Sequence, residues 1–369
     1  MKRLMVNLKV YLILIVFSIF QGLWISSYST ELFKDIYILK FGWIILSLVL
    51  SFELSIIIHE LGHLIFGLLS GYRFSSIRYR NMLIKRDEFG KLKFYKLTIL
   101  GTGGQCLMIP PQKEDAPVFL YNAGGVILNL LFAGVILIFL KLVFVSNFML
   151  ASFLLIFLNM HVLMAFINWV SLKGVINDGE NHRIIKNNPN TKTSLIELLT
   201  YHAKLTEGTP LSILQLERDY RSVGNETTLQ RNVLACHAEQ KTHQLNFEKA
   251  LEILNFADME NQGSSMVDAR LALSKYACLL MIDKDEAITY QENYQKLVKQ
   301  GRMISSKMYS GALLNLMESA ILENTWDNQE ATRYLELIEK DPVPGISKDS
   351  KIVFDALYRR FQSSQENDA

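Results

Sequence analysis

Residues 41–72 form an apolar stretch, long enough to cross a bilayer, that contains the motif His59-Glu60-Leu61-Gly62-His63. A membrane span needs about 20 mostly apolar residues, and ionisable side chains at that depth are costly and usually functional. On a helix, His59 and His63 lie one turn apart on the same face, so both imidazoles can reach one ion, with Glu60 beside them as a candidate base. The motif therefore predicts metal-assisted hydrolysis within a membrane.

The charge of the chain is divided unevenly between its two halves. Residues 1–188 carry 18 Lys and Arg against 10 Asp and Glu, whereas residues 189–369 carry 20 against 26. The two regions therefore differ in character, and the near-neutral total of +2 gives no indication of nucleic acid, which we do not expect as a partner. Cys106, Cys236 and Cys278 match no metal-ligand spacing, so we expect packed, reduced thiols.

Four charge-poor apolar runs predict a polytopic membrane domain over residues 1–188, with helices at about 10–30, 41–72, 116–140 and 148–172. The first run could instead be a secretory signal peptide, but no convincing cleavage site precedes Thr30, so we expect a retained helix. The loop 73–115 carries nine basic residues against four acidic ones. We therefore expect this loop and both termini on the cytoplasmic side of the cell membrane, with the bilayer as a partner.

The two histidines need a further ligand, because zinc hydrolases usually have three protein ligands and keep a fourth position open. The segment after the last predicted span offers Asp178, with Glu180 and His182 as chemically possible rivals. Asp178 is our choice among the three, although on its own Asn177-Asp178-Gly179 is better explained as an ordinary turn after a membrane helix. A zinc ion held by these groups would lower the pKa of its water, and Glu60 would take the proton as water attacks a peptide carbonyl.

These motifs resemble the site-2 protease family of intramembrane zinc metalloproteases over about residues 40–185. The resemblance implies one Zn2+ per chain, with His59, His63 and the Asp178 of a late Asp-Gly motif as its ligands. It is carried by HELGH at 59–63, Gly124-Gly125-Val126-Ile127-Leu128-Asn129-Leu130, and the asparagine-bearing span before Asp178-Gly179. The sequence departs from the family at Gly124 and Val126, where Ala and Pro are usual, and it lacks the prolines between Asn168 and Asp178.

Asn129 lies inside the third predicted span, where it could donate to a substrate carbonyl or oxyanion, or form an interhelical hydrogen bond. The loop 73–115 is expected to hold a small β insertion, with strands over 92–99 and 105–109 separated by a glycine cluster. The resemblance implies that such a segment pairs with an extended substrate. The alternative is a plain hairpin on the membrane surface, with its basic residues facing anionic lipid.

Residues 189–369 lack an apolar run long enough to span a membrane, and their apolar residues recur at helical spacing. We predict a soluble cytoplasmic α-helical solenoid, tetratricopeptide-like, in which Ala250, Ala287 and Ala331 are equivalent small anchors spaced 37 and 44 residues apart. Such stacks often bind a protein or peptide on a concave surface, although this one could instead only stabilise or dimerise the chain.

Two functions remain open from the sequence. The first is an intramembrane zinc metalloprotease that cleaves a peptide bond in or near the transmembrane segment of a membrane-anchored regulator or a precursor peptide. The alternative is a noncatalytic, membrane-anchored scaffold whose helical domain binds a partner. The intact His59, Glu60 and His63, with Asp178 available, favour the enzyme.

Overall fold

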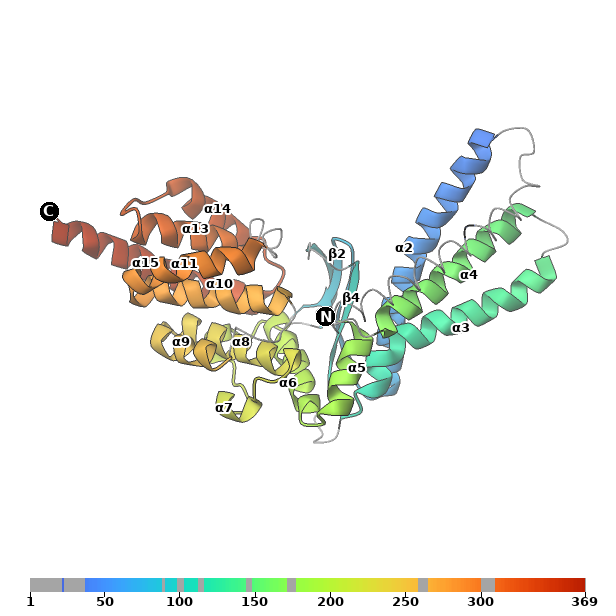
Figure 1. The fold of residues 1–369 in the computed structure, drawn as a ribbon, viewed down its shortest axis with the longest axis horizontal. Coiled ribbons are helices and arrows are strands. Elements are labelled where there is room, and N and C mark those ends of the chain that lie inside the picture. The colour runs from blue at the N-terminus through green and yellow to red at the C-terminus, as the bar shows by residue number, and fades with distance from the viewer. Residues whose placement is uncertain are drawn as a thin grey trace. The chain divides into compact units, whose positions relative to one another are not determined.

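The computed structural model describes residues 22, 37–87, 90–97, 103–111, 116–143, 148–170, 177–257, 265–299 and 309–368 (Figure 1). The chain divides into two compact units. The first comprises residues 1–73, 103–106 and 113–186, and the second comprises residues 74–102, 107–112 and 187–369. Much of the loop that we assigned to the membrane domain thus belongs to the second unit.

Three long helices of the first unit are apolar enough to cross a membrane: α2 (Tyr37–Leu69), α3 (Phe119–Val143) and α4 (Phe148–Trp169). They coincide with three of the four predicted spans, while the span expected at 10–30 lies outside the described residues apart from residue 22. Many of their large apolar side chains are exposed, as expected for helices that face lipid. The structure therefore supports a membrane domain without testing the count of four spans.

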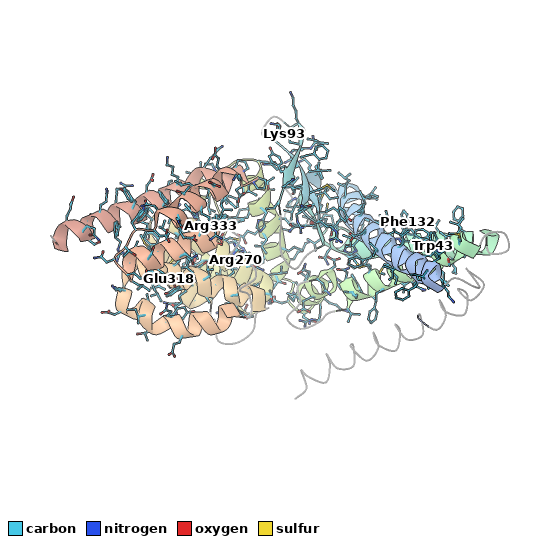
Figure 2. All side chains as sticks on the ribbon, turned by 90° about the horizontal axis from the view of Figure 1, so that it is seen from above. Trp43, Lys93, Phe132, Arg270, Glu318 and Arg333 are labelled. Atoms are coloured by element: carbon cyan, nitrogen blue, oxygen red, sulfur yellow. The ribbon has the colours of Figure 1, made fainter. Side chains whose placement is uncertain are left out.

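Small residues let these helices approach closely. A Cβ built on Gly62 of α2 would lie 2.7 Å from the Cα of Gly125 in α3, so the two backbones touch where the glycines meet. At the other end of α2, the Trp43 indole donates to Ser152 Oγ in α4 over 3.0 Å (Figure 2). Backbone contact and an interhelical hydrogen bond thus both hold the bundle.

A four-stranded sheet follows α2, in the order β3-β2-β1-β4. Its strands are β1 (Arg73–Tyr79), β2 (Met82–Arg86), β3 (Leu92–Lys96) and β4 (Gly104–Ile109). Pairing is antiparallel between β1 and β2 and between β2 and β3. The sequence predicted β3 and β4 but missed β1 and β2. The alternative of a plain hairpin is wrong, because β2 and β1 lie between the two predicted strands.

A short helix, α5 (Asp178–Asn187), closes the first unit. It begins directly after Asn177, whose Oδ1 accepts from the backbone N–H of Glu180, so Asn177 caps the helix. The Asn177 amide also donates to the Ile167 and Val170 carbonyls at the end of α4, over 2.8 and 2.9 Å. The start of α5 is therefore fixed to the end of the preceding span.

The remainder of the second unit is helical (Figure 1). Its elements are α6 (Thr191–Thr206), η1 (Leu211–Ile213), α7 (Tyr220–Val223), α8 (Thr228–His243), α9 (Phe247–Phe256), α10 (Ser265–Ile282), α11 (Lys284–Lys299), α13 (Tyr309–Ile321), α14 (Asn328–Glu339) and α15 (Pro344–Asp368).

Three of these helices begin in the same way. The side chains of Asn246, Asp283 and Asp327 accept hydrogen bonds from backbone N–H groups in the first turns of α9, α11 and α14. The alanines expected as equivalent anchors lie four residues after each cap and are buried at Ala250, Ala287 and Ala331. The recurring alanine thus marks three helices, α9, α11 and α14, each of which has a capped N-terminus and is the second helix of a pair. A tetratricopeptide-like solenoid stays a prediction.

Ion pairs and hydrogen bonds link helices across this domain. The Arg270 guanidinium in α10 lies 2.8 Å from Glu239 of α8, and the Tyr276 hydroxyl donates to Glu318 of α13 over 2.9 Å (Figure 2). The helices share one large apolar core, so the domain is built by burial and fixed in register by these polar contacts.

Candidate metal centre

His59, His63 and Asp178 come together within the first unit. His59 Nε2 lies 3.2 Å from His63 Nε2, and Asp178 Oδ2 lies 3.2 Å from His59 Nε2 and 3.4 Å from His63 Nε2. Ligand atoms about 2.0–2.1 Å from a tetrahedral zinc lie about 3.3–3.4 Å from one another. The three atoms thus form a nearly equilateral triangle of the size that such an ion requires.

The three ligand atoms lie in a buried site, and one of them is left without a hydrogen-bond partner. Asp178 Oδ2 has no well-aligned hydrogen-bond donor, although both imidazole nitrogens lie near it. Burial alone would raise the pKa of the Asp178 carboxyl, but the neighbouring His63 and His59 imidazoles outweigh burial and hold that pKa below its ordinary value. An anionic oxygen and two imidazole nitrogens that converge in a buried site are a donor set suited to zinc.

Each histidine is oriented through its second ring nitrogen. His63 Nδ1 donates to the Tyr121 carbonyl of α3 over 2.8 Å, which leaves Nε2 free of a proton in the neutral ring. His59 Nδ1 lies 3.2 Å from the amide nitrogen of Asn129, whose Oδ1 is 2.8 Å from His161 Nδ1 of α4. The fully buried Asn129 of α3 therefore links α2, which carries the HELGH motif, to α4.

Two glycines permit the close packing. A Cβ on Gly125 would lie 2.6 Å from His59 Nδ1 and Nε2, so only glycine leaves room for the imidazole at this point of α3. A Cβ on Gly179, the residue after Asp178, would collide with the Trp169 backbone at the end of α4. Each of these two glycines thus leaves room for a neighbouring group, the His59 ring at Gly125 and the Trp169 backbone at Gly179.

Asp178 is held from α3 as well as from α4. The Asn122 amide donates to the Asp178 carbonyl over 2.6 Å, and Asn181 of α5 donates to Asn122 Oδ1 over 3.4 Å. The sequence interpretation missed Asn122 and the Tyr121 carbonyl. A polar residue seven positions before Asn129 in a lipid-spanning helix was the available signal for Asn122.

The rival ligands are engaged elsewhere. Glu180 is buried and forms an ion pair with Arg183, and His182 stacks on Trp169 with 5.2 Å between ring centroids. Among the described residues, only His59, His63 and Asp178 form a group of three or more potential ligands. Of the three candidates in this segment, the structure thus brings Asp178 to the histidines.

Glu60 is buried next to the first residue of β4. A Cβ on Gly104 would lie 2.5 Å from Glu60 Oε1, so the strand backbone passes directly against this carboxylate. The Tyr121 hydroxyl donates to the Cys106 carbonyl over 2.9 Å and fixes the same strand to α3. The candidate base, next to His59 in sequence, therefore lies against the start of a β-strand.

The chain matches the model of peptidase family M50 over residues 47–326, which is most of its length. The chain belongs to this family, the site-2 protease family, and is by this membership an intramembrane metalloprotease in its general class. The match extends beyond the region in which the motifs indicated a resemblance and includes much of the helical domain. Comparisons with curated proteins and with solved structures found no match.

Proposed function

We propose that the chain is a zinc peptidase that hydrolyses a peptide bond in or near the transmembrane segment of a membrane-anchored regulator or precursor peptide. The observation that carries the proposal is the triangle of His59 Nε2, His63 Nε2 and Asp178 Oδ2, whose sides are 3.2–3.4 Å. These three residues would hold the ion. Zinc, when bound, supplies Lewis acidity, which polarises the scissile carbonyl and makes water nucleophilic near neutral pH.

Glu60 would act as the general base. It is adjacent to His59 in sequence and is buried, so little bulk water competes for its carboxylate. Glu60 takes a proton from the attacking water and returns it to the nitrogen of the departing amine, which completes hydrolysis without a covalent enzyme intermediate. A base of this kind typically contributes about 10²–10⁴-fold to the rate.

The strand β4 would receive the substrate. A helical substrate must be opened before its peptide bond can be cleaved, and an extended segment can be held by backbone hydrogen bonds to a sheet edge. β4 is the last strand in the sheet order, and its first residue lies against Glu60. A peptide added at this edge would therefore run past the base.

Asn129 would orient His59. To bind zinc through Nε2, a neutral His59 must carry its proton on Nδ1, which then needs an acceptor. The Asn129 amide provides one when its oxygen faces His59 and its NH2 group faces His161; the two orientations of an amide have nearly the same shape. Direct contact of Asn129 with substrate stays a prediction.

The wider arrangement extends this proposal. Four spans with both termini cytoplasmic would place residues 189–369 beside the cytoplasmic face of the membrane. There a tetratricopeptide-like domain could recruit a substrate or a protein partner. Membership in M50 and the assembled donor set do not favour the noncatalytic scaffold.

Metal analysis and cleavage together test the proposal. Purified full-length protein should contain about one zinc per chain. His59→Ala should lose the metal, whereas Glu60→Gln should retain it and cleave about 10²–10⁴-fold more slowly. Cleavage can be followed without a known substrate by comparing the N-termini of membrane peptides from cells that express wild type or Glu60→Gln.

A folded wild-type protein that binds no zinc would exclude the metal site. Equal cleavage by wild type and by Glu60→Gln would remove Glu60 from the mechanism. A metal-loaded wild type that releases no new N-terminus relative to Glu60→Gln would contradict peptidase activity in those membranes.

A further inference from the structure

The two faces of the β sheet differ in what they present. The register pairs Ser76 with Lys85, Arg78 with Leu83, and Leu83 with Tyr95, so these residues share one face. This inner face is buried at Ser76, Arg78, Leu83 and Lys85. Its Lys85 is 2% exposed and donates to the Thr206 carbonyl at the end of α6 over 3.3 Å, and the ammonium lies 5.0 Å from the centre of the Tyr95 ring.

The opposite face is open and apolar. There the register pairs Met82 with Lys96, Ile84 with Phe94, and Arg86 with Leu92. Phe94 is 78% exposed, and Met82 and Leu92 are each 56% exposed. Three large apolar side chains this accessible on adjacent strands form a patch of the kind that marks an interaction site.

We define the outer face as Met82, Ile84, Arg86, Leu92, Phe94 and Lys96, and its basic residues lie at its edges. Arg86 and Lys96 lie at its two ends, and no acidic residue belongs to the face. The surrounding loop 73–115 is also rich in Lys and Arg. Apolar side chains flanked by cations are complementary to the interface of a bilayer that contains anionic headgroups.

The chain keeps the sheet close to a membrane surface. The span α2 ends at Leu69, and Gly71, with φ +83°, turns the chain so that β1 begins at Arg73. Four residue steps cover at most about 14 Å, so the first strand starts near the level at which α2 leaves the bilayer. A lipid surface is therefore within reach of the sheet without any other component.

We propose that the outer face of the sheet binds the anionic surface of the bilayer, with Leu92, Phe94 and Met82 inserted at headgroup level and Arg86 and Lys96 contacting lipid phosphate. The inner face, fixed to α6 through Lys85, would then hold the helical domain at the membrane. None of its residues belongs to the metal centre, and its occupant is lipid rather than substrate.

Spin labels at introduced cysteines test this proposal in the full-length protein. Single variants Leu92→Cys and Phe94→Cys report the outer face. Lys93→Cys reports the residue between them, which the register places on the other face; Lys93 is labelled in Figure 2. Ile213→Cys in the helical domain is the matched control because Ile213 is 68% exposed. The native cysteines are buried, so labelling is directed to the new site.

The labelled proteins are placed in nanodiscs of phosphatidylcholine, alone or mixed with phosphatidylglycerol. Accessibility of each label to oxygen, which concentrates in lipid, is compared with its accessibility to a water-soluble nickel chelate. We expect labels at 92 and 94 to be lipid-accessible, and more so with phosphatidylglycerol, whereas labels at 93 and 213 should stay water-accessible.

The charges are tested with Arg86→Gln/Lys96→Gln against Arg221→Gln/Lys340→Gln, an equally charged pair in the helical domain whose side chains are 69% and 72% exposed. Each removed cation on the outer face should lower the ratio of lipid-bound to free label at position 94 by about fivefold. The control pair should leave that ratio unchanged.

Three results would overturn the proposal. The first is water accessibility of positions 92 and 94 in both lipid mixtures. The second is exclusion of both oxygen and nickel at those positions, which would mean that a protein covers the face. The third is lipid contact that depends neither on phosphatidylglycerol nor on Arg86 and Lys96.

Discussion

Gly125 provides the sharpest test of the metal centre, because its substitution by alanine adds one methyl group directly against His59. The new Cβ would lie 2.6 Å from both ring nitrogens, whereas ordinary contacts of a Cβ are 3.4–4 Å. The imidazole would have to move by roughly 1 Å, and a ligand that is misplaced this far loses its geometry toward the ion. Gly125→Ala should therefore weaken zinc binding.

The expected loss is about 10–100-fold in zinc affinity, the range found when the support of a metal ligand is disturbed. The assay is competition for zinc between the purified protein and a chromophoric chelator. Gly134→Ala is the matched control, since Gly134 lies in the same helix and its new Cβ would meet nothing within 4 Å. This control should bind zinc as the wild type does.

Helix propensity makes the comparison stringent. Both substitutions replace glycine with a better helix former by about the same amount, so a change in helix stability alone would affect both variants in the same direction. If Gly125→Ala binds zinc with the affinity of Gly134→Ala, the packing of α3 on His59 is not as described, and the reasoning from it is refuted.

Three further predictions concern other parts of the chain. Asn129→Ala should lower zinc affinity by about 10–100-fold, measured by the same competition, because His59 loses its hydrogen-bond partner; unchanged affinity would remove Asn129 from the support of the site. Asp327→Ala should destabilise the start of α14 by about 1 kcal/mol, so hydrogen exchange of the first amides of this helix should become about fivefold faster. Asn328→Ala retains the cap and should leave this exchange rate unchanged. Burial raises the pKa of Cys236 to about 12 and of Cys278 to about 11, so both should resist iodoacetamide at about pH 8 until the protein is unfolded; rapid alkylation of the folded protein, detected by peptide mass spectrometry, would contradict their packing.

The β sheet was only partly evident from sequence for a physical reason. Strands with one buried face usually alternate apolar and polar residues. In β1 and β2 the buried positions include Arg78 and Lys85, whereas the exposed positions include Met82. The usual alternation is therefore reversed at several positions. The two buried cations find carbonyl acceptors: Lys85 donates to Thr206 at the end of α6, and Arg78 donates to Arg80 in the turn after β1.

Local spacing determined the part of the site that lies on one helix. His59 and His63 share a face through helix geometry alone, and an apolar stretch of this length favours a membrane span in any fold. The helices that carry Ala250, Ala287 and Ala331 were indicated in the same way by apolar residues that recur at helical spacing. These features depend on residues a few positions apart, so the sequence by itself determined them.

Tertiary structure decided which groups complete the metal site that His59 and His63 begin, and which groups support it. Asp178 lies more than a hundred residues from the histidines, and its approach depends on Asn122, Asn177 and Gly179. Periodicity cannot encode such contacts, because they arise from the packing of α3, α4 and α5 against the motif helix. The sequence specified two imidazoles and a base; only the folded chain brings a carboxylate oxygen to within 3.4 Å of both rings.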